Sequence, residues 1–540
     1  MNFAATDGWL VLALGTSVVL AQPLPWVGAN ASVEGLVVSR STGQPLARVE
    51  VILERVSERE SFRALTQHDG KFRFTGLPPG TYRLSVSKPG YLAPTYAELA
   101  GTRMPLTFPL SSGENLTDLI VRLAKGAVVA GTVRFRDGEP AVNVPVHLFR
   151  EIIEPSTRGY TLVSRAQTDD LGRFRFYGLA PGEYYLLAAH PALPATQSDR
   201  APMVQEATVP TFYASSPDAA HATALVLREE DELDRLEVVL AEVPVNRVRG
   251  WVVRGDTGER VRAASFQVLQ EGPRANTWVP VPLTVRWERE GEFELVNVPA
   301  GRYLLVAELR LGDTRWIARK RLEVAGGEVR DWEVRLEPER EIMGRLAAAE
   351  GAQELENASV LLVPRTLLDA PRPAEVHPDG TFLIRCEPGE IYDVYLEGLP
   401  PDAYLEGAWL AGTNVLLSGL VCESAGPATL EVVYGTRGAR IRGVVTQGPT
   451  RVAIGAKVSL IPDPPAGRVQ QYRTTRSNPF GLYELRGIAP GRYIAVAWWD
   501  EPPCRIYEST ELERCRQLGR VVELSPGEEQ FLALPVITGR

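Results

Sequence analysis

The most reactive side chains in this sequence belong to four cysteines and five histidines. Cys504 and Cys515 flank a short polar stretch near the end of the chain, and Cys386 and Cys422 lie in an earlier segment. We expect pairing within each segment, because each pair falls inside one predicted domain. A bond between Cys504 and Cys515 is favoured, since exposed thiols are a liability in an oxidising compartment. The alternative is four unpaired thiols, with Cys386 acting as a small apolar residue in a strand.

The spacing of histidines and carboxylates indicates no catalytic or metal-binding group. His147 and Glu151 come closest to a zinc-peptidase pair, but their spacing differs from His-x-x-Glu. The acidic run 229–232 is interpreted as a solvated loop. Nucleophile-elbow, phosphate-loop and dinucleotide motifs do not occur in the sequence. The prediction is therefore a protein that is not an enzyme, with no catalytic residues, no cofactor and no metal site.

Aromatic side chains remain as candidates for ligand binding. Trp498 and Trp499 are adjacent, so in a strand one indole faces the core and the other faces the opposite side of the sheet. An exposed indole can stack on a sugar ring or anchor a partner protein, whereas core packing is the alternative for each. Trp499, which Asp500 and Glu501 follow, is the first candidate ligand-stacking residue, and Trp498 is the second.

These residues belong to a chain in which one phrase recurs five times. It reads DGKFRFTGLPPGTY at 69–82 and LGRFRFYGLAPGEY at 171–184, and further copies occupy 290–303, 379–391 and 480–493. A phrase that returns about every hundred residues indicates an array of small domains, each with its own core.

The residues around the phrase alternate between apolar and polar, as strands do. Val49, Val51 and Leu53 share one face, and the segments 72–74 and 82–86 repeat the period of two. Pro79-Gly80 supplies the residues of a type II turn between the last two segments. About six or seven such strands per unit predict an antiparallel β-sandwich of about a hundred residues.

The fourth copy departs from the pattern. It is one residue shorter between Gly380 and Gly389, and Ile391 stands where the other copies have tyrosine. We therefore expect a different turn in this copy. Helix is expected only as one or two turns around 508–517.

The repeated unit resembles the carboxypeptidase regulatory-like domain, which is related to collagen-adhesin B-type repeats. Gly35, the segment 43–46 and the segment 69–84 match it well, as does 443–496 near the end of the chain. The second and third copies match mainly in their second halves, and the fourth matches weakly. The resemblance implies transthyretin-like sandwiches that act as non-catalytic modules beside metallopeptidases, outer-membrane receptors or surface proteins. Related starch-binding-like sandwiches bind carbohydrate, so carbohydrate is the first ligand class to consider.

The predicted fold class is all-β, a tandem array of about five antiparallel β-sandwich modules of transthyretin-like or immunoglobulin-like type. The predicted domains are a signal peptide at 1–21, module 1 at 30–124, module 2 at 125–242, module 3 at 243–338, a divergent module 4 at 339–435 and module 5 at 436–540.

Composition limits the partners and the compartment. A formal charge of -9 and a pI near 5.4 disfavour nucleic acid and a polybasic membrane surface. The apolar run 9–21 fits a secretory signal cleaved before Gln22, although Asp7 stands where a positive charge is usual. A mis-assigned start or an uncleaved anchor is the alternative. No other segment is apolar enough to span a membrane, so the mature chain is expected to be soluble or tethered only at its start. With the secretory signal, the predicted location is extracytoplasmic: periplasmic, cell-surface or secreted.

The preferred interpretation is a non-catalytic exported protein that recognises carbohydrate or another surface through repeated modules. Independent units along an elongated particle would add weak contacts through effective concentration. The alternatives are a protein–protein adhesion or envelope scaffold that binds a cell-surface protein, and an accessory component of a peptidase or outer-membrane transport system.

Overall fold

The computed structural model describes residues 31–537, except for short gaps at 100–101, 105, 191–204, 263–264, 289–290, 351–354, 356, 367–369, 423–428, 449–450, 466 and 500–501. The predicted signal peptide at 1–21 lies outside the described residues. The names module 1 to module 5 keep the ranges predicted from the sequence.

Modules 1, 2 and 4 each consist of two separate sheets. In module 1 the sheets are β4 (Lys71–Leu77), β1 (Ala31–Ser39), β9 (Asn115–Leu123), β6 (Ala97–Leu99) and β7 (Thr102–Met104), and β3 (Glu60–Leu65), β2 (Glu50–Arg55), β5 (Gly80–Ser87) and β8 (Thr107–Leu110). In module 2 they are β13 (Arg173–Leu179), β10 (Ala127–Arg134) and β18 (Glu232–Val239), and β12 (Arg158–Gln167), β11 (Pro145–Ile153), β14 (Gly182–Ala188), β16 (Thr211–Phe212) and β17 (Leu225–Leu227). In module 4 they are β30 (Thr381–Cys386), β27 (Arg340–Ala348), β35 (Leu430–Gly435), β32 (Tyr404–Leu410) and β33 (Thr413–Asn414), and β29 (Arg372–Glu375), β28 (Ser359–Pro364), β31 (Ile391–Glu397) and β34 (Leu420–Val421).

In modules 3 and 5 strand pairing joins the two layers into one continuous sheet. Module 3 contains β21 (Trp278–Pro280), β20 (Ser265–Glu271), β24 (Gly301–Leu311), β25 (Thr314–Val324), β26 (Val329–Pro338), β19 (Glu242–Arg254), β23 (Glu292–Pro299) and β22 (Thr284–Trp287), with β15 (Gln205–Thr208) added to β19. Module 5 contains β37 (Arg451–Val452), β36 (Ala439–Gln447), β43 (Glu529–Ile537), β41 (Gly491–Trp498), β38 (Lys457–Pro462) and β39 (Arg473–Arg476), with β40 (Leu482–Ile488) on β36 and β42 (Arg520–Leu524) on β41.

Helices are few and short in the described part of the chain. The α-helices are α1 (Val415–Ser418) and α2 (Leu512–Leu518), and the 3-10 turns are η1 (Ala219–His221), η2 (Val469–Gln471) and η3 (Ser509–Glu511). The helical turns expected around 508–517 correspond to η3 and α2. Among the described residues, no helix has the length and apolar character needed to cross a membrane. The predicted all-β fold class is confirmed.

One strand arrangement recurs in all five modules. The first strand of each module pairs antiparallel with the strand that carries the Phe-x-Phe or equivalent pattern and parallel with the last strand, as β1 does with β4 and β9. The corresponding trios are β13-β10-β18, β23-β19-β26, β30-β27-β35 and β40-β36-β43. Each mostly antiparallel sandwich therefore contains this parallel pair, and module 5 has a second one between β41 and β43. A period of two in the sequence does not distinguish parallel from antiparallel pairing.

The glycine in the first strand is fixed by close packing. A Cβ on Gly35 would lie 2.4 Å from the carbonyl oxygen of Leu119 and 2.6 Å from the ring of Phe72. A Cβ on Gly443 would lie 1.8 Å from the carbonyl oxygen of Leu532. The first strand, its parallel neighbour and an aromatic ring thus meet where only a residue without a side chain fits.

Gly443→Ala is expected to lower the free energy of unfolding by about 1–3 kcal/mol, because backbone must shift to admit the new methyl group. Chemical denaturation followed by circular dichroism measures this change. Gln447→Ala, at the exposed end of the same strand, is the control and should stay within about 0.5 kcal/mol of the unaltered protein. Equal stability of the two variants would contradict the close packing.

A buried tyrosine closes the same turn in four modules. The turn is Pro-Gly in modules 1, 2 and 5 and Ala300-Gly301 in module 3. The hydroxyl of Tyr82 donates to the carbonyl oxygen of Pro78 at 2.8 Å, and that of Tyr493 donates to Ala489 at 2.7 Å. Tyr184 and Tyr303 make the same bond four residues back. In module 4 the turn differs, as expected, and the buried tyrosine is Tyr392, whose hydroxyl accepts a hydrogen bond from the Glu387 amide at 3.0 Å.

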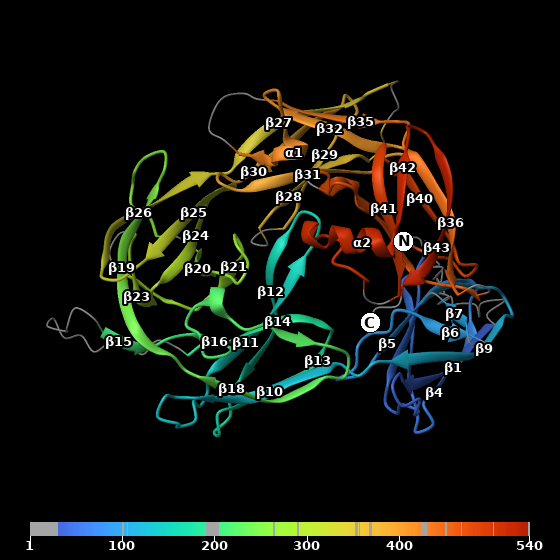
Figure 1. Ribbon diagram of the computed structural model, residues 1–540, viewed down its shortest axis with the longest axis horizontal. Helices are drawn as coiled ribbons and strands as arrows, with labels where there is room; N and C mark the ends of the chain where they lie inside the picture. The colour runs from blue at the N-terminus through green and yellow to red at the C-terminus, as the bar shows by residue number, and fades with distance from the viewer. Residues whose placement is uncertain are drawn as a thin grey trace, which may run out of the picture.

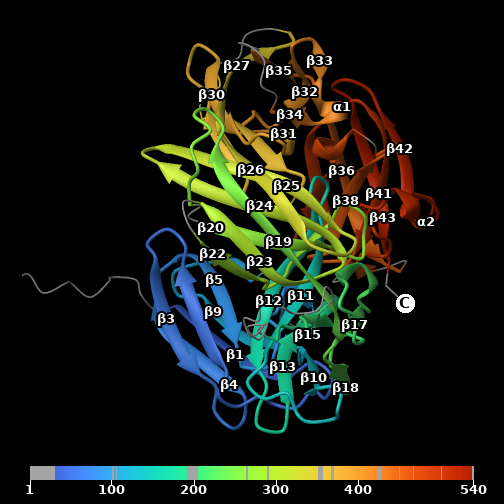
Figure 2. The same cartoon turned by 90° about the vertical axis from the view of Figure 1, so that its left-hand side faces the viewer.

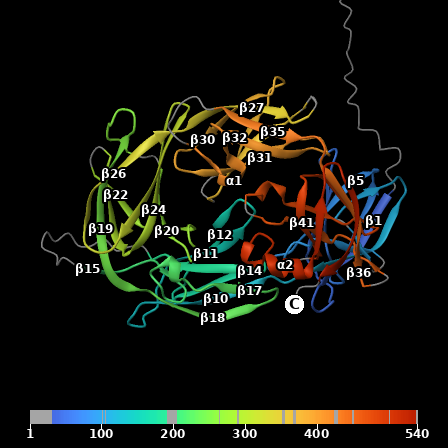
Figure 3. The same ribbon diagram turned by 45° about the horizontal axis from the view of Figure 1, so that its top comes forward.

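The modules form a closed ring, which corrects the expected elongated array (Figure 1). Both side-on and face-on views place module 4 opposite modules 1 and 2 (Figures 1 and 2). The hairpin of β11 and β12 lies in the middle of the ring (Figures 1 and 3). Its tip bonds to module 4, with Ser156 Oγ 2.5 Å from the Tyr395 hydroxyl and Thr157 Oγ1 donating to the Pro364 carbonyl oxygen at 3.1 Å.

The cores show how modules 2 and 3 are joined. Modules 1 and 4 each have a core of their own. Module 2 has one core inside its sandwich, but Phe149, Tyr185 and Phe212 on its other side belong to the core of module 3. Modules 2 and 3 are therefore joined by buried apolar surface, which is the main source of stability at domain contacts.

Candidate functional site

The outward face of the strand that carries the repeated tyrosine is covered differently in different modules. In β5 of module 1 the outward side chains are polar and exposed. In β14 the outward Tyr185 and Leu187 are buried against module 3. In β41 the outward Ile494, Val496 and Trp498 are buried beneath the segment that carries α2.

Both predicted disulfides are present. Cys386, the last residue of β30, is bonded to Cys422, which follows β34, with their Cα atoms 6.0 Å apart. Cys504 is bonded to Cys515 of α2, with their Cα atoms 5.5 Å apart. All four sulfur atoms are buried, and the second bond holds the segment that covers the outer face of β41.

The double substitution Cys504→Ser and Cys515→Ser is expected to reduce the free energy of unfolding by about 2–3 kcal/mol, because the unfolded chain regains the entropy of a short loop. Equilibrium unfolding in denaturant measures the change. Thr510→Ala, on the exposed surface of the same segment, serves as the control. An unchanged unfolding midpoint in the double variant would show that the segment is held without the bond.

The two candidate tryptophans pack against different clusters: Trp498 is the last residue of β41, and Trp499 follows it. Trp498 is only 3% exposed and packs against the disulfide-bonded segment, so its ring is not available for stacking on a ligand. Trp499 is half-buried at the edge of the module 5 core. The stacking prediction therefore concerns Trp499 alone.

Trp499 lines a cavity of about 940 Å³ at the junction of three modules. Module 1 contributes Arg40 and Thr95, and module 2 contributes Arg150 and the turn at Pro181. The remaining polar and aromatic lining comes from Glu183, Arg228, Glu229, Lys457, Arg476, Trp499 and Arg505. The cavity thus exists only where the first, second and fifth modules meet.

Two ion pairs hold the walls of this cavity together. Arg40 Nη1 of module 1 lies 2.7 Å from Glu229 Oε1 of module 2. Arg505 of module 5 pairs with Glu183 of module 2 and, at 3.3 Å, with Glu508. Burial opposes ionisation of Arg505, but the charges of Glu183 and Glu508 outweigh it and hold the pKa of this guanidinium above its ordinary value.

Arg150 is fixed by the Pro-Gly turn beside the cavity. Its Nη2 donates to the carbonyl oxygen of Pro181 at 2.9 Å, and its guanidinium carbon lies 5.9 Å from the centre of the Tyr184 ring. Arg55 makes the same contact with the Pro79 carbonyl oxygen in module 1. Arg150 is therefore part of the repeated turn as well as part of the cavity wall.

The histidines do not gather into a site. His147 is half-buried in β11, where burial and the charge of Arg165 lower the pKa of its imidazole. His221 lies 2.7 Å from Asp218 on the surface of module 2. Within the part of the chain that the structure describes, no three His, Cys, Asp or Glu side chains are grouped as metal ligands would be.

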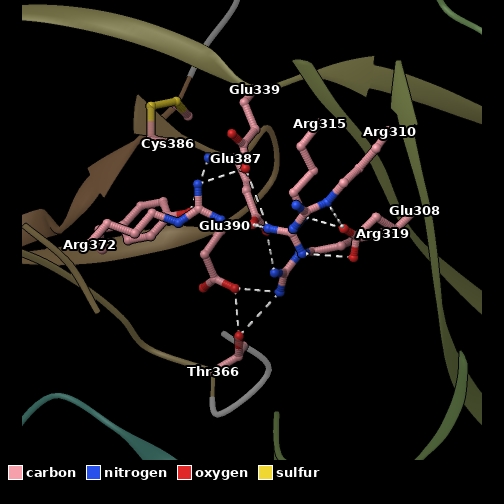
Figure 4. A network of polar contacts seen from close by, with 12 residues as sticks. Glu308, Arg310, Arg315, Arg319, Glu339, Thr366, Arg372, Cys386, Glu387 and Glu390 are labelled. Atoms are coloured by element: carbon pink, nitrogen blue, oxygen red, sulfur yellow. Dashed lines mark hydrogen bonds and ion pairs between the residues drawn. A yellow bond between two sulfur atoms is a disulfide. The ribbon is translucent and has the colours of Figure 1, made fainter. Parts of the chain in front are cut away.

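A buried ionic network between modules 3 and 4 is the largest polar feature that sequence reasoning missed (Figure 4). Glu387 has no exposed side-chain surface, and Arg315, Arg319 and Arg372 all contact its carboxylate. Arg319 also reaches Glu390 at 2.6 Å.

The network arises from strand geometry. Arg315 and Arg319 are separated by an even number of residues in β25, so they point to the same side of the sheet, toward the turn of module 4 that contains Glu387. Burial opposes ionisation of Arg372, but its hydrogen bond to Glu339 at 2.7 Å and the charge of Glu387 raise the pKa of its guanidinium. Glu387 and Glu390 flank the Pro388-Gly389 turn, where this module lacks the usual tyrosine spacing, and that irregularity was the available signal in the sequence.

The fold is that of a tandem β-sandwich protein, and a surface cavity lies at the junction of modules 1, 2 and 5. Residues 32–111 match the carboxypeptidase regulatory-like domain family, which confirms the resemblance inferred from the repeated phrase.

Curated relatives and solved structures are more distant. The mouse BOS complex subunit NOMO1 is 26% identical over 299 residues, covering 51% of this chain and 21% of the relative. The human BOS complex subunit NOMO3 is 26% identical over 296 residues, covering 51% of this chain and 20% of the relative. This chain therefore spans about a fifth of the length of these relatives. A streptococcal ancillary pilin is 14% identical over 57% of this chain and 99% of its own, with a TM-score of 0.18. The minor pilin GBS52 of Streptococcus agalactiae is 14% identical over 40% of this chain and 97% of its own, with a TM-score of 0.22.

Proposed function

We propose that this protein is a non-catalytic, exported recognition protein that binds carbohydrate at the cavity shared by modules 1, 2 and 5. The observation that carries the proposal is the half-buried indole of Trp499 in the wall of that cavity. A recessed aromatic face with polar groups around it is the arrangement that stacks on a sugar ring and bonds its hydroxyl groups.

Export is supported by the two disulfides, because such bonds persist in oxidising compartments and are rare in the cytosol. The predicted signal peptide at 1–21 belongs to the same proposal. Sequencing the amino terminus of the protein released by its host tests it, with Gln22 as the expected first residue.

Trp499→Ala is expected to reduce binding to a glycan array at least about fivefold, since loss of a stacking contact on an aromatic ring costs about 1 kcal/mol or more. Trp251→Ala removes a half-buried indole from module 3, outside the cavity, and should leave binding unchanged. Far-ultraviolet circular dichroism checks that both variants are folded. Equal binding by the two variants, or no binding by the unaltered protein, would contradict the proposal.

A second candidate function is recognition of a protein partner, as an adhesin, an envelope scaffold or an accessory component of a larger assembly. The observation that favours it is an apolar patch on module 5, where Phe480 is 74% exposed, Phe531 is 69% exposed and Leu482 is 46% exposed. Exposed aromatic side chains of this kind mark protein contacts. The relatives named as BOS complex subunits add to this candidate.

Substitutions in the apolar patch of module 5 and in the junction cavity distinguish the two candidate functions. Cross-linking in the native host should yield an adduct that Phe480→Ser and Phe531→Ser remove and that Trp499→Ala leaves intact if the protein patch is the binding surface. The opposite pattern on the glycan array supports the junction cavity.

A further inference from the structure

We propose that the cavity at the junction of modules 1, 2 and 5 selects an anionic glycan, one that carries carboxylate or sulfate groups. This inference rests on the proposed carbohydrate binding and adds the charge of the ligand to it. Nothing in the repeated phrase or in Trp499 itself indicates that charge.

The first argument is the local excess of positive charge. The described lining residues include six cationic side chains, Arg40, Arg150, Arg228, Lys457, Arg476 and Arg505, and two carboxylates, Glu183 and Glu229. The chain as a whole carries a formal charge of -9. A recess whose sign opposes that of the whole molecule concentrates ligands of the opposite charge, because its low-dielectric walls focus the field.

The second argument is that the two carboxylates are already engaged. Glu229 is bonded to Arg40, and Glu183 is bonded to Arg505. Among the residues that the structure describes, Arg228 and Arg476 have no carboxylate partner, and both are exposed at the cavity. Arg476 keeps its direction through a hydrogen bond from Nη1 to the Gly455 carbonyl oxygen at 3.0 Å.

The third argument concerns the type of cation. Guanidinium groups present a planar set of donors that matches carboxylate and sulfate oxygens in pairs, and five of the six cations are arginines. Arg228 comes from module 2 and Arg476 from module 5, so an acidic group between them would meet donors from two modules. The indole of Trp499 in the same wall would contact the face of the sugar ring.

Two matched pairs of oligosaccharides test selection for charge separately from sugar binding. The probes are a galacturonic acid hexamer and its methyl ester, which share one backbone and differ in charge. A second pair is a dextran sulfate oligomer and the uncharged dextran oligomer. Isothermal titration calorimetry on the full chain measures all four at low salt.

The acidic member of at least one pair is expected to bind at least about tenfold more tightly than its neutral partner, as charge-assisted hydrogen bonds imply. The advantage should shrink as sodium chloride rises from about 20 mM to about 500 mM, because exposed charges are then screened. Arg228→Gln with Arg476→Gln should lower affinity for the acidic member much more than affinity for the neutral member, so that the advantage is lost. Arg63→Gln, an exposed substitution on β3 outside the cavity, is the control.

The outcomes separate this inference from the proposed function. Equal affinity for acidic and neutral members, with loss of both in Trp499→Ala, would retain carbohydrate binding and overturn the selection for charge. No binding to any of the four probes would overturn both. A single-stranded oligonucleotide that binds more tightly than either acidic glycan would also overturn the inference in favour of a nucleic-acid ligand.

Discussion

Replacing Glu387 with glutamine is expected to lower the free energy of unfolding by about 3–5 kcal/mol, because it breaks a buried ionic network by removing one partner. The glutamine keeps the shape of the side chain but leaves the guanidinium groups of Arg315, Arg319 and Arg372 with less negative charge around them. Arg319 is only 6% exposed, so water cannot compensate for the loss. Denaturant unfolding gives the change in free energy, and small-angle X-ray scattering shows whether modules 3 and 4 separate.

The matched control for this change is Glu341→Gln. Glu341 pairs with Arg385 at 2.9 Å in the same module, but both side chains are about half exposed. Exposed pairs contribute about 0–1 kcal/mol, so this variant should unfold almost as the unaltered protein does. If both substitutions had the same small effect, the network would not hold the two modules together.

The second large effect is expected from Tyr185→Ala, which should cost about 3–5 kcal/mol through the cavity it leaves. Tyr185 lies on the outer face of β14, 5% exposed, with its ring centre 5.1 Å from that of Tyr160. Its neighbour Tyr184 faces the core of module 2 and is not changed. The substitution therefore weakens the contact between modules 2 and 3 more than either sandwich.

Differential scanning calorimetry distinguishes this from ordinary core damage. Loss of the contact should split one unfolding transition into two, because modules that share buried surface unfold together. Tyr177→Ala, which removes an exposed tyrosine of module 2, is the control and should change the free energy by no more than about 0.5 kcal/mol. A single transition with an unchanged midpoint in Tyr185→Ala would show that the modules unfold independently.

The strands and turns could be predicted because their signals are local. Alternating residues such as Phe72 and Phe74, with the Pro-Gly turn after them, place β4 and β5 correctly. In module 4 the position equivalent to the tyrosine of the other copies is Ile391. The turn of this module is shorter, and the buried tyrosine is the next residue, Tyr392.

The closed ring could not be predicted from alternation alone, although part of its signal is in the sequence. In β5 polar residues alternate with apolar ones, whereas β14 reads GEYYLLA and is buried on both faces. A strand that is apolar on both faces needs cover on its second side. The pattern indicates that cover exists, but it does not say that module 3 supplies it.

The residues of the candidate site also differ in whether the sequence predicts them. Trp499 could be named from its position beside Trp498, because adjacent residues of a strand face opposite sides. The arginines around it could not, since Arg40, Arg228 and Arg476 are far apart in sequence and meet only through the packing of three modules.

The residues that line the junction cavity come from both ends of the chain, so the complete cavity can form only late in synthesis. Domains of a growing chain fold from the amino-terminal end. Arg40 is synthesised early, whereas Trp499 and Arg505 belong to the last module. A nascent chain therefore carries only part of the pocket until its final module has folded against the first two. If the proposed ligand needs the whole cavity, binding is expected only after synthesis is complete.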